Sequence, residues 1–340
     1  MSLMSRVDDF QRAHPVLGFP LAVVYKFTDD QGPFLAAIVT YYTFTAIFPL
    51  MLIGTSILGF VLQDDPELQK QLLDTALSQI PIVGDQLGRP EGISGSTSAI
   101  IWGSLVAIYG SLGVGQSIQN AANVAWAVPR NSRPNPILMR LRSMAIVMMG
   151  GTALIAVAVL ISLMGNRDVI EIDNQTLLAW LARGAGFLIS LVLFLSLFTM
   201  LSLKRARWRA VVPGALFCAF GWLVLQYIGN SYVINVIGKA SSMNQTFALV
   251  LGLLAFLYLS ATMIVLGLEI NVVRRRKMFP RALLTPFTDN VTLGSGDRRA
   301  YESYAHMQRH KGFQTITVEF AAEKDRLKES DSRPDAEPGD

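Results

Sequence analysis

An uninterrupted apolar run near the end of the chain constrains the fold more than any other feature. Residues 246–268 are almost entirely apolar, and Glu269, Asn271 and the basic run 274–277 follow directly. About 20 helical residues cross a hydrocarbon core of roughly 30 Å, and Lys and Arg concentrate on the cytoplasmic side of such helices. The segment therefore predicts an integral membrane protein whose C-terminus is cytoplasmic.

Composition agrees with residence in a membrane. Of the residues, 51% are hydrophobic and 16% are charged, with a mean hydropathy of +0.40, which is too apolar for a soluble domain of this size. The net charge of +4 does not indicate nucleic-acid binding, because the basic residues form short clusters beside apolar segments. The single cysteine, Cys218, excludes a disulfide within the chain and a cysteine-based metal site.

Six apolar segments have the length and low charge of membrane-spanning helices. They are residues 34–62, 97–121, 143–164, 177–203, 210–232 and 246–273. Sixteen Lys and Arg residues fall before the first segment, in every second connection and in residues 274–281 after the last segment, whereas four fall in the remaining connections. This alternation predicts an all-α, polytopic membrane protein with a bundle of six transmembrane helices and both termini in the cytoplasm.

Three regions follow from this topology. Residues 1–33 form an N-terminal cytoplasmic or interfacial segment, in which residues 16–27 read as a short interfacial helix. Residues 34–273 form the transmembrane domain, whose external loop 63–96 has the pattern of an amphipathic helix. Residues 274–340 form a cytoplasmic tail that is expected to be largely disordered from Phe287 onward, because charge, Ser and Pro replace the apolar pattern.

Glycine and other small residues inside the apolar segments predict close helix packing. Gly110, Gly150 and Gly151 are examples. Small residues allow helix backbones to approach closely in lipid, where apolar burial provides little drive for association.

The second apolar segment carries a polar face. At 100° per residue, one third of the helix circumference holds Tyr109, Gln116, Gln119, Asn120 and Asn123. Unpaired polar groups are costly in lipid, so this face should point towards other helices or water. Hydrogen bonding between helices and the lining of a substrate path both remain open as its role.

Polar residues on two other segments are predicted at a similar depth, in the cytoplasmic half. Tyr41 and Thr45 share a face of the first segment, and Pro49 removes the hydrogen bond to the Thr45 carbonyl and so marks a hinge candidate. Glu269 lies at the inner end of the last segment. It is either part of a functional site or a boundary carboxylate paired with a nearby arginine.

Patterns of soluble catalysis are missing from the sequence. The three histidines, His14, His306 and His310, lie in the terminal regions, and there is no Walker A or GxGxxG motif. We therefore expect no enzyme activity, no catalytic residue, no cofactor and no metal.

Several short stretches resemble the YihY/BrkB family of bacterial inner-membrane proteins. The first apolar segment carries the residues 36–44 with Phe48 and Pro49, and the second ends in residues 119–124 with Trp126 and Arg130. The fifth begins with Trp208, Pro213, Gly214 and Ala215, and the last carries residues 257–259, Leu266, Gly267, Glu269 and Asn271. The resemblance covers roughly residues 34–273.

The resemblance implies a six-helix protein of the bacterial plasma membrane. Some members carry a historical label as ribonuclease BN, and a transport or export role has been suggested for the family. A metal-dependent ribonuclease would need clustered His and carboxylate ligands, which this chain lacks.

The leading hypothesis is a transporter or exporter of an unknown solute, ion or lipid. Its substrate-lining candidates are Tyr41, Thr45, Gln116, Asn120 and Glu269. The alternative is a non-transporting membrane scaffold or envelope-assembly factor. The expected partners are the lipid bilayer and a small solute or lipid, with a homo-oligomer left open and no nucleic acid.

Overall fold

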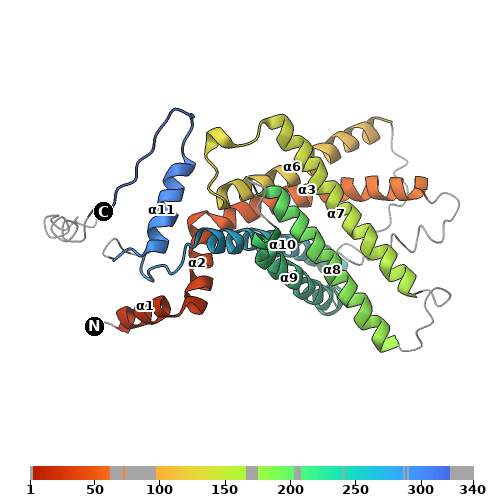
Figure 1. Ribbon diagram of the computed structural model, residues 1–340. Coiled ribbons are helices and arrows are strands. Elements are labelled where there is room, and N and C mark those ends of the chain that lie inside the picture. The colour runs from red at the N-terminus through yellow and green to blue at the C-terminus, as the bar shows by residue number, and fades with distance from the viewer. Residues whose placement is uncertain are drawn as a thin grey trace. The chain divides into compact units, whose positions relative to one another are not determined.

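The computed structural model is helical throughout its regular structure (Figure 1). It describes residues 3–61, 72, 97–165, 175–202, 208–239, 242–285, 288 and 291–321, and within these ranges no strand occurs. The predicted amphipathic helix of the loop 63–96 lies outside the described residues apart from Leu72. The prediction of an all-α fold is confirmed for the part of the chain that is described.

Most helices are long because their sequences are long apolar runs with few helix breakers. In chain order they are α1 (Leu3–Ala13), α2 (Pro15–Asp29), α3 (Gly32–Val61), α6 (Thr97–Ala125), α7 (Pro136–Gly165), α8 (Gln175–Leu201), α9 (Val212–Tyr232), α10 (Ser242–Arg276) and α11 (Ser295–Met307). A π-helical turn, Val233–Ile237, continues α9, and short 3₁₀ turns lie at Arg130–Ser132 and Trp208–Ala210. Proline lies in the first turn of α2 and of α9, where its missing N–H has no helical partner to lose.

Four helices are long and apolar enough to cross a membrane. These candidate spans are Pro136–Ile161, Thr176–Leu201, Val212–Ile237 and Asn244–Arg276. The first two predicted segments correspond to α3 and α6. In α3 the described apolar stretch, Gly32–Ile47, is shorter than a span. The sequence therefore predicted a helical membrane protein correctly, whereas its count of six spans is not confirmed by the four found in the described residues.

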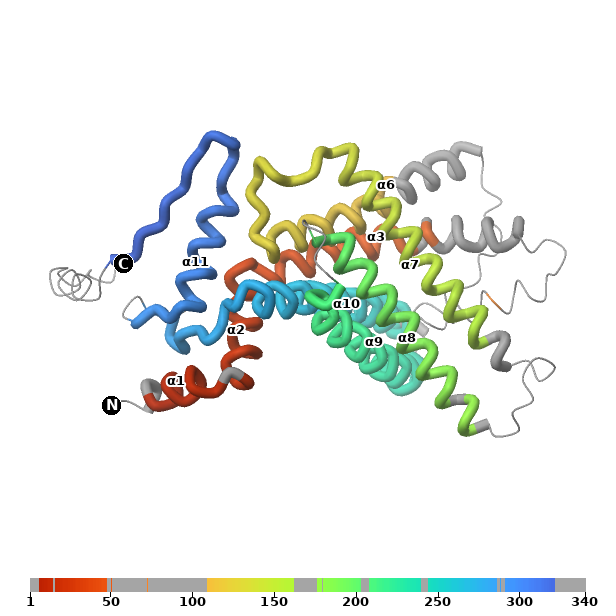
Figure 2. Tube along the Cα trace, in the orientation of Figure 1, coloured from red at the N-terminus to blue at the C-terminus, as the bar shows by residue number. Residues whose placement is uncertain are grey.

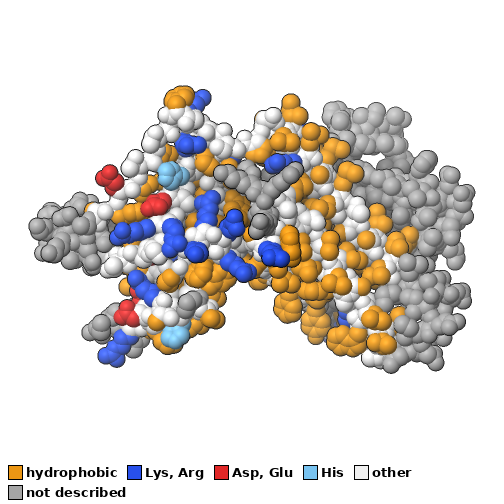
Figure 3. Space-filling view, viewed as in Figure 1, with side chains coloured by type: hydrophobic (Ala, Val, Ile, Leu, Met, Phe, Trp, Pro, Cys, Tyr) orange, Lys and Arg blue, Asp and Glu red, His pale blue; other side chains and the backbone are white. Residues whose placement is uncertain are grey.

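The surface of the candidate spans suits a lipid environment. In the apolar stretch that qualifies each helix as a candidate span, 11% of α7 but 44% of α10 is buried inside the protein. Of the four helices, α10 is therefore the most enclosed. Exposed large side chains on the others include Met148, Leu188, Val192 and Phe220. Hydrophobic side chains cover much of the described surface of α7, α8 and α9 in Figure 3. In a bilayer, lipid tails would cover these side chains.

The chain divides into two compact units. Unit 1 consists of Met1–Asp30, Val124–Arg133 and Glu269–Asp340, and unit 2 consists of Gln31–Asn123 and Pro134–Leu268. The predicted three-region division of the chain is not tested by this grouping and stays a prediction. The grouping nevertheless shows that the N-terminal helices belong with the chain after Glu269.

Helix packing in unit 2 depends on close approach at several glycines. A methyl group on Gly115 of α6 would lie 2.4 Å from the Ser143 Cα of α7, and one on Gly267 of α10 would lie 2.5 Å from the Cys218 Sγ of α9. Gly110 of α6 similarly faces the Ala46 backbone of α3. By contrast, Gly150 and Gly151 have no described neighbour within 4 Å. The packing prediction therefore holds for Gly110 but not for these two.

Replacing Gly115 with alanine should destabilise the contact between α6 and α7. The added methyl group would overlap backbone atoms of Ser143, which cannot move aside as a flexible side chain can. We expect a loss of about 1–3 kcal/mol, measured as a lower thermal midpoint in lipid nanodiscs. The matched control is Gly150→Ala, which adds the same methyl group in open space; an equal effect of both variants would refute the assignment.

In unit 1, α11 differs from the sequence prediction. A largely disordered tail was expected after Phe287, whereas residues 295–307 form a helix that buries Gly296, Asp297 and Ala300. Figure 2 shows α11 beside α2 and the C-terminal end of α10. The physical reason is Arg281, whose guanidinium binds Asp297 at 2.9 Å and Asp29 at 2.7 Å. Composition does not reveal such a tertiary ion pair.

Candidate functional site

A buried cluster of charged side chains lies where α2 ends. Lys26 and Asp30 are four residues apart, so they share one face of the last turn of α2. The Lys26 ammonium donates a hydrogen bond to Asp30 Oδ2 and lies 3.5 Å from Glu269 Oε2 on α10. We call Lys26, Asp30 and Glu269 the buried triad; their side chains are 1%, 2% and 0% exposed.

The walls of the triad come from α10 and α11. Lys26 Nζ lies 5.1 Å from the centre of the Tyr304 ring, a cation–π distance. Arg276, about two turns beyond Glu269 on α10, donates a hydrogen bond to the Trp126 carbonyl and interacts electrostatically with Asp30. Burial and the charges of Asp30 and Asp29 raise the pKa of the Tyr304 phenol, so this group stays neutral at physiological pH.

The two carboxyl groups of the triad compete for one ammonium. Burial raises the pKa of the Asp30 carboxyl, although Lys26 opposes the shift. Asp30 and Glu269 both lie within ion-pair distance of the Lys26 ammonium, yet among the described residues neither Glu269 oxygen has a hydrogen-bond partner. Two ionised carboxylates have no hydrogen to share, and with one lysine they leave one negative charge uncompensated.

The neighbouring Arg281 cluster has its hydrogen bonds satisfied. Its guanidinium binds both Asp29 and Asp297, and Asp297 Oδ2 also accepts hydrogen bonds from the backbone N–H groups of Ala282 and Gly294, each at 3.0 Å. Burial opposes the Arg281 charge, but the two carboxylates outweigh it and raise the pKa of Arg281. This arrangement joins α11 to α2 and is structural.

The structure brings Glu269 together with a lysine rather than with the arginine that the sequence suggested. The pairing partner of this carboxylate is Lys26, and Asp30 is the second acid. Sequence reasoning missed both residues, since Lys26 was counted only as one of the basic residues before the first span. The available signal was a single lysine within the apolar stretch 16–27, spaced i, i+4 from an aspartate.

The other predicted site residues lie in unit 2. Tyr41 is 65% exposed and its ring contacts Tyr42 edge-on, while Thr45 Oγ1 donates to the Tyr41 carbonyl within α3. Gln116 and Asn120 are partly buried on α6. Their grouping with Glu269 into one site stays a prediction.

Part of the predicted polar face of α6 contacts α7. Gln119 is buried, and its amide donates to the Met139 carbonyl and to Ser143 Oγ of α7, each at 2.9 Å. At this position the face serves hydrogen bonding between helices. The helix α3 continues through Pro49, whose role as a hinge stays a prediction.

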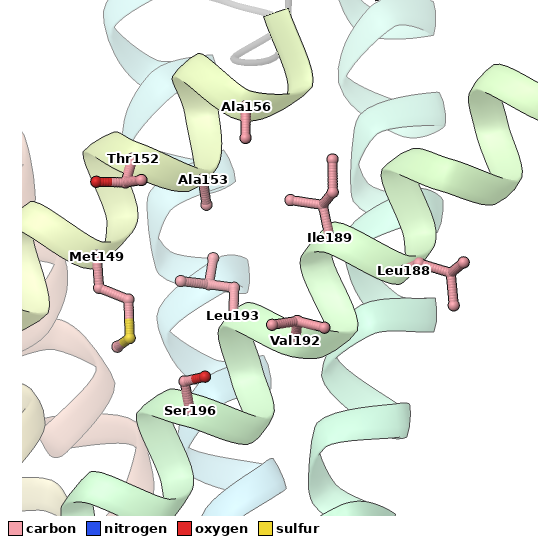
Figure 4. A pocket seen from close by; sticks show the side chains of 9 residues that line it. All are labelled: Met149, Thr152, Ala153, Ala156, Leu188, Ile189, Val192, Leu193 and Ser196. Atoms are coloured by element: carbon pink, nitrogen blue, oxygen red, sulfur yellow. The ribbon is translucent and has the colours of Figure 1, made fainter. Parts of the chain in front are cut away.

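An open groove separates α7 and α8 in unit 2 (Figure 4). It has a volume of about 440 Å³ and is lined by apolar side chains with two hydroxyl groups, those of Thr152 and Ser196. The Thr152 hydroxyl is already bonded to the Met148 carbonyl at 2.8 Å. The groove therefore lacks the charged groups that the buried triad offers.

The described part of the chain offers no cluster of side chains suited to a metal ion. Among its residues, no group of three or more His, Cys, Asp or Glu side chains is arranged to hold a metal ion. The expectations of no metal, no cofactor and no enzyme activity stay predictions.

Comparison with known proteins gives a family match over most of the chain. The model of a family described as "Virulence factor BrkB" matches residues 23–289, a range that contains the buried triad and Arg281. A ribonuclease-like protein of Bacillus subtilis (strain 168) named YfkH is 24% identical over 75% of this chain and 94% of its own length. The inner membrane protein YhjD of Escherichia coli (strain K12) is 25% identical over 73% of this chain and 78% of its own length. No solved structure matches.

Proposed function

Because the chain belongs to the Virulence factor BrkB family and is a helical membrane protein, we propose that it binds and moves a small solute, ion or lipid across the membrane. We place it in the bacterial plasma membrane as a six-span protein with both termini in the cytoplasm. The inner-membrane relative supports the location, and the alternation of basic residues supports the topology.

The observation that carries this proposal is the buried triad. Glu269 lies within the candidate span Asn244–Arg276, is fully buried, and shares one lysine with a second buried acid. An ionisable group within a membrane segment is costly and marks functional sites such as ion and proton paths. The Arg281 cluster also has two acids for one base, but its carboxylates have their hydrogen bonds satisfied. Among the described residues neither Glu269 oxygen has a hydrogen-bond partner, and this unsatisfied second carboxylate favours a function beyond stability.

Polar groups of α3 and α6 complete the proposed path. Tyr41, Thr45, Gln116 and Asn120 are the substrate-lining candidates, and Pro49 is the proposed flexing point. The exposed phenol of Tyr41 and the partly buried amide of Gln116 offer hydrogen bonds to a passing solute, and Asn120 lies partly buried one turn further along α6.

We propose no enzymatic activity. A relative is named as ribonuclease-like, but hydrolysis of RNA with a metal requires clustered ligands, and the three histidines of this chain lie in its terminal regions.

Native mass spectrometry of the protein in lipid nanodiscs tests the proposal. We expect the purified wild-type protein to retain a specific small molecule or lipid, and Glu269→Gln and Asn120→Ala to lose it. Glu302→Gln is the matched control, since it removes the same charge from an exposed position on α11. Equal retention by all variants would remove Glu269 and Asn120 from the site.

A truncated protein, studied in the same nanodiscs, distinguishes a transporter from a scaffold. Truncation after Ala321 removes the charged end of the chain but keeps α11 and the Arg281–Asp297 ion pair. A scaffold that holds partners through its tail would lose them on truncation while retaining no small molecule. A transporter would keep its bound molecule in the truncated form.

A further inference from the structure

We propose that the buried triad is a binding site for one proton, which the carboxyl groups of Asp30 and Glu269 share and which leaves and returns during the transport cycle. This inference deepens the proposed function and rests on it for the role of the proton in transport. The existence of the proton site itself stands on geometry.

The two acids of the triad lie beside one ammonium and are both buried. Asp30 and Glu269 both lie within ion-pair distance of the same Lys26 ammonium, and their side chains are 2% and 0% exposed. Neither Glu269 oxygen has a hydrogen-bond donor among the described residues. Two adjacent buried carboxylates cannot both ionise without strong repulsion, whereas one proton between them turns the repulsion into a hydrogen bond.

The charges around the two acids balance only one of them. Among the described residues, Lys26 provides the one ammonium within ion-pair distance of the two acids. Arg276 interacts with Asp30 but is bonded to the Trp126 carbonyl and is partly exposed, so solvent screens its charge. Asp29 is paired with Arg281, and Tyr304 presents a neutral ring to Lys26. With one proton bound, the triad carries no net charge, as burial requires.

The site suits a proton better than a metal cation. A metal cation at the two carboxylates would have to lie beside the Lys26 ammonium, which already contacts both of them. Two cations this close in a buried site would repel each other strongly. A proton needs no space and no additional ligands, so the arrangement favours H⁺ over Na⁺ or a divalent ion.

Binding and release involve one proton and water only. In the loaded state, one carboxyl group donates its O–H to the other carboxylate, and Lys26 pairs with the charge that remains. On release, the proton passes to water as hydronium, and the triad is left with one net negative charge. That charge would favour a rearrangement that exposes the site to water, as a coupled transporter requires.

Infrared difference spectroscopy on the full chain in lipid nanodiscs tests the site without a transported solute. Protein is titrated from roughly pH 5 to pH 10, above the ordinary carboxyl range of about 4. We expect the wild-type protein to lose the C=O band of one protonated carboxyl group in this range. The control Glu302→Gln should keep this band.

The decisive variants are Asp30→Asn and Glu269→Gln. Each leaves one carboxylate paired with Lys26, so the bound proton is no longer needed and the band should vanish in both. A band lost in only one variant would show an independent acid and overturn the sharing. A wild-type titration without the band, or one that Na⁺ shifts as strongly as pH does, would overturn the proton site.

Failure here is distinguishable from failure of the proposed function. Because the titration uses no solute, a missing band would leave specific retention of a small molecule unaffected. Conversely, a protein that retains no molecule could still show the shared proton. Thermal midpoints of the variants identify any that do not fold. Asp30→Ser or Glu269→Ser then replaces the variant that does not fold, because each also removes one carboxyl group.

Discussion

Replacing Arg281 with methionine should lower the free energy of unfolding by about 3–5 kcal/mol, the cost of leaving a buried charge without its partner. The Arg281 and Asp297 side chains are 1% and 0% exposed and 2.9 Å apart. Removal of the guanidinium leaves Asp297 with two backbone hydrogen bonds but no counter-charge. It also removes the ion pair with Asp29, which then keeps the hydrogen bond from the Tyr304 hydroxyl at 3.1 Å, and therefore loosens the attachment of α11 to α2.

Thermal unfolding in lipid nanodiscs and limited proteolysis of α11 measure this effect. Arg298→Met is the matched control, because Arg298 lies on α11 with an exposed side chain. We expect faster cleavage of α11 only in the Arg281 variant. Equal stability of the two variants would mean that the buried ion pair does not hold α11 in place.

Replacing Lys26 with methionine should destabilise the protein by a similar amount, again about 3–5 kcal/mol at neutral pH. The variant leaves Asp30 and Glu269 together in a buried site without a cation. Adding Asp30→Asn to Lys26→Met removes one of the two acids and should restore part of the loss. This rescue separates the charge effect from the loss of the lysine's packing.

The loss of stability caused by Lys26→Met should increase as pH rises. Burial raises the pKa of Asp30 in the folded protein above its unfolded value, so the folded state binds more protons between the two values. Stability then falls as pH rises through that interval and recovers as pH falls. Without Lys26 the interval extends to higher pH. Thermal midpoints that do not change with pH in Lys26→Met would contradict this explanation.

Sequence reasoning predicted the class of the protein and one member of the triad. Long apolar runs specify helices in lipid because the backbone must satisfy its own hydrogen bonds, and an acid within such a run, Glu269, is conspicuous for the same reason. Lys26 and Asp30 could not be assigned to it, since their contact with Glu269 depends on how α2 packs against α10. Such a contact has no local sequence signature.

The tail and the polar face show the same limit. The chain after Phe287 has the composition of a disordered segment, yet Asp297 is ordered by its contact with Arg281. Gln119 lies on the predicted polar face of α6, but only the structure shows that its amide is used by Met139 and Ser143. Periodicity identifies a face, whereas its use depends on the neighbouring helix.

Uptake into proteoliposomes tests the central claim, that the buried triad is the working site of a proton-coupled transporter. The substrate is the molecule that co-purifies with the wild-type protein, labelled and offered with and without an imposed pH gradient. We predict that the gradient drives uptake by the wild-type protein and by Glu302→Gln, and that Asp30→Asn and Glu269→Gln show no gradient-driven uptake. Equal uptake by all four proteins, or wild-type uptake that does not respond to the gradient, would contradict it.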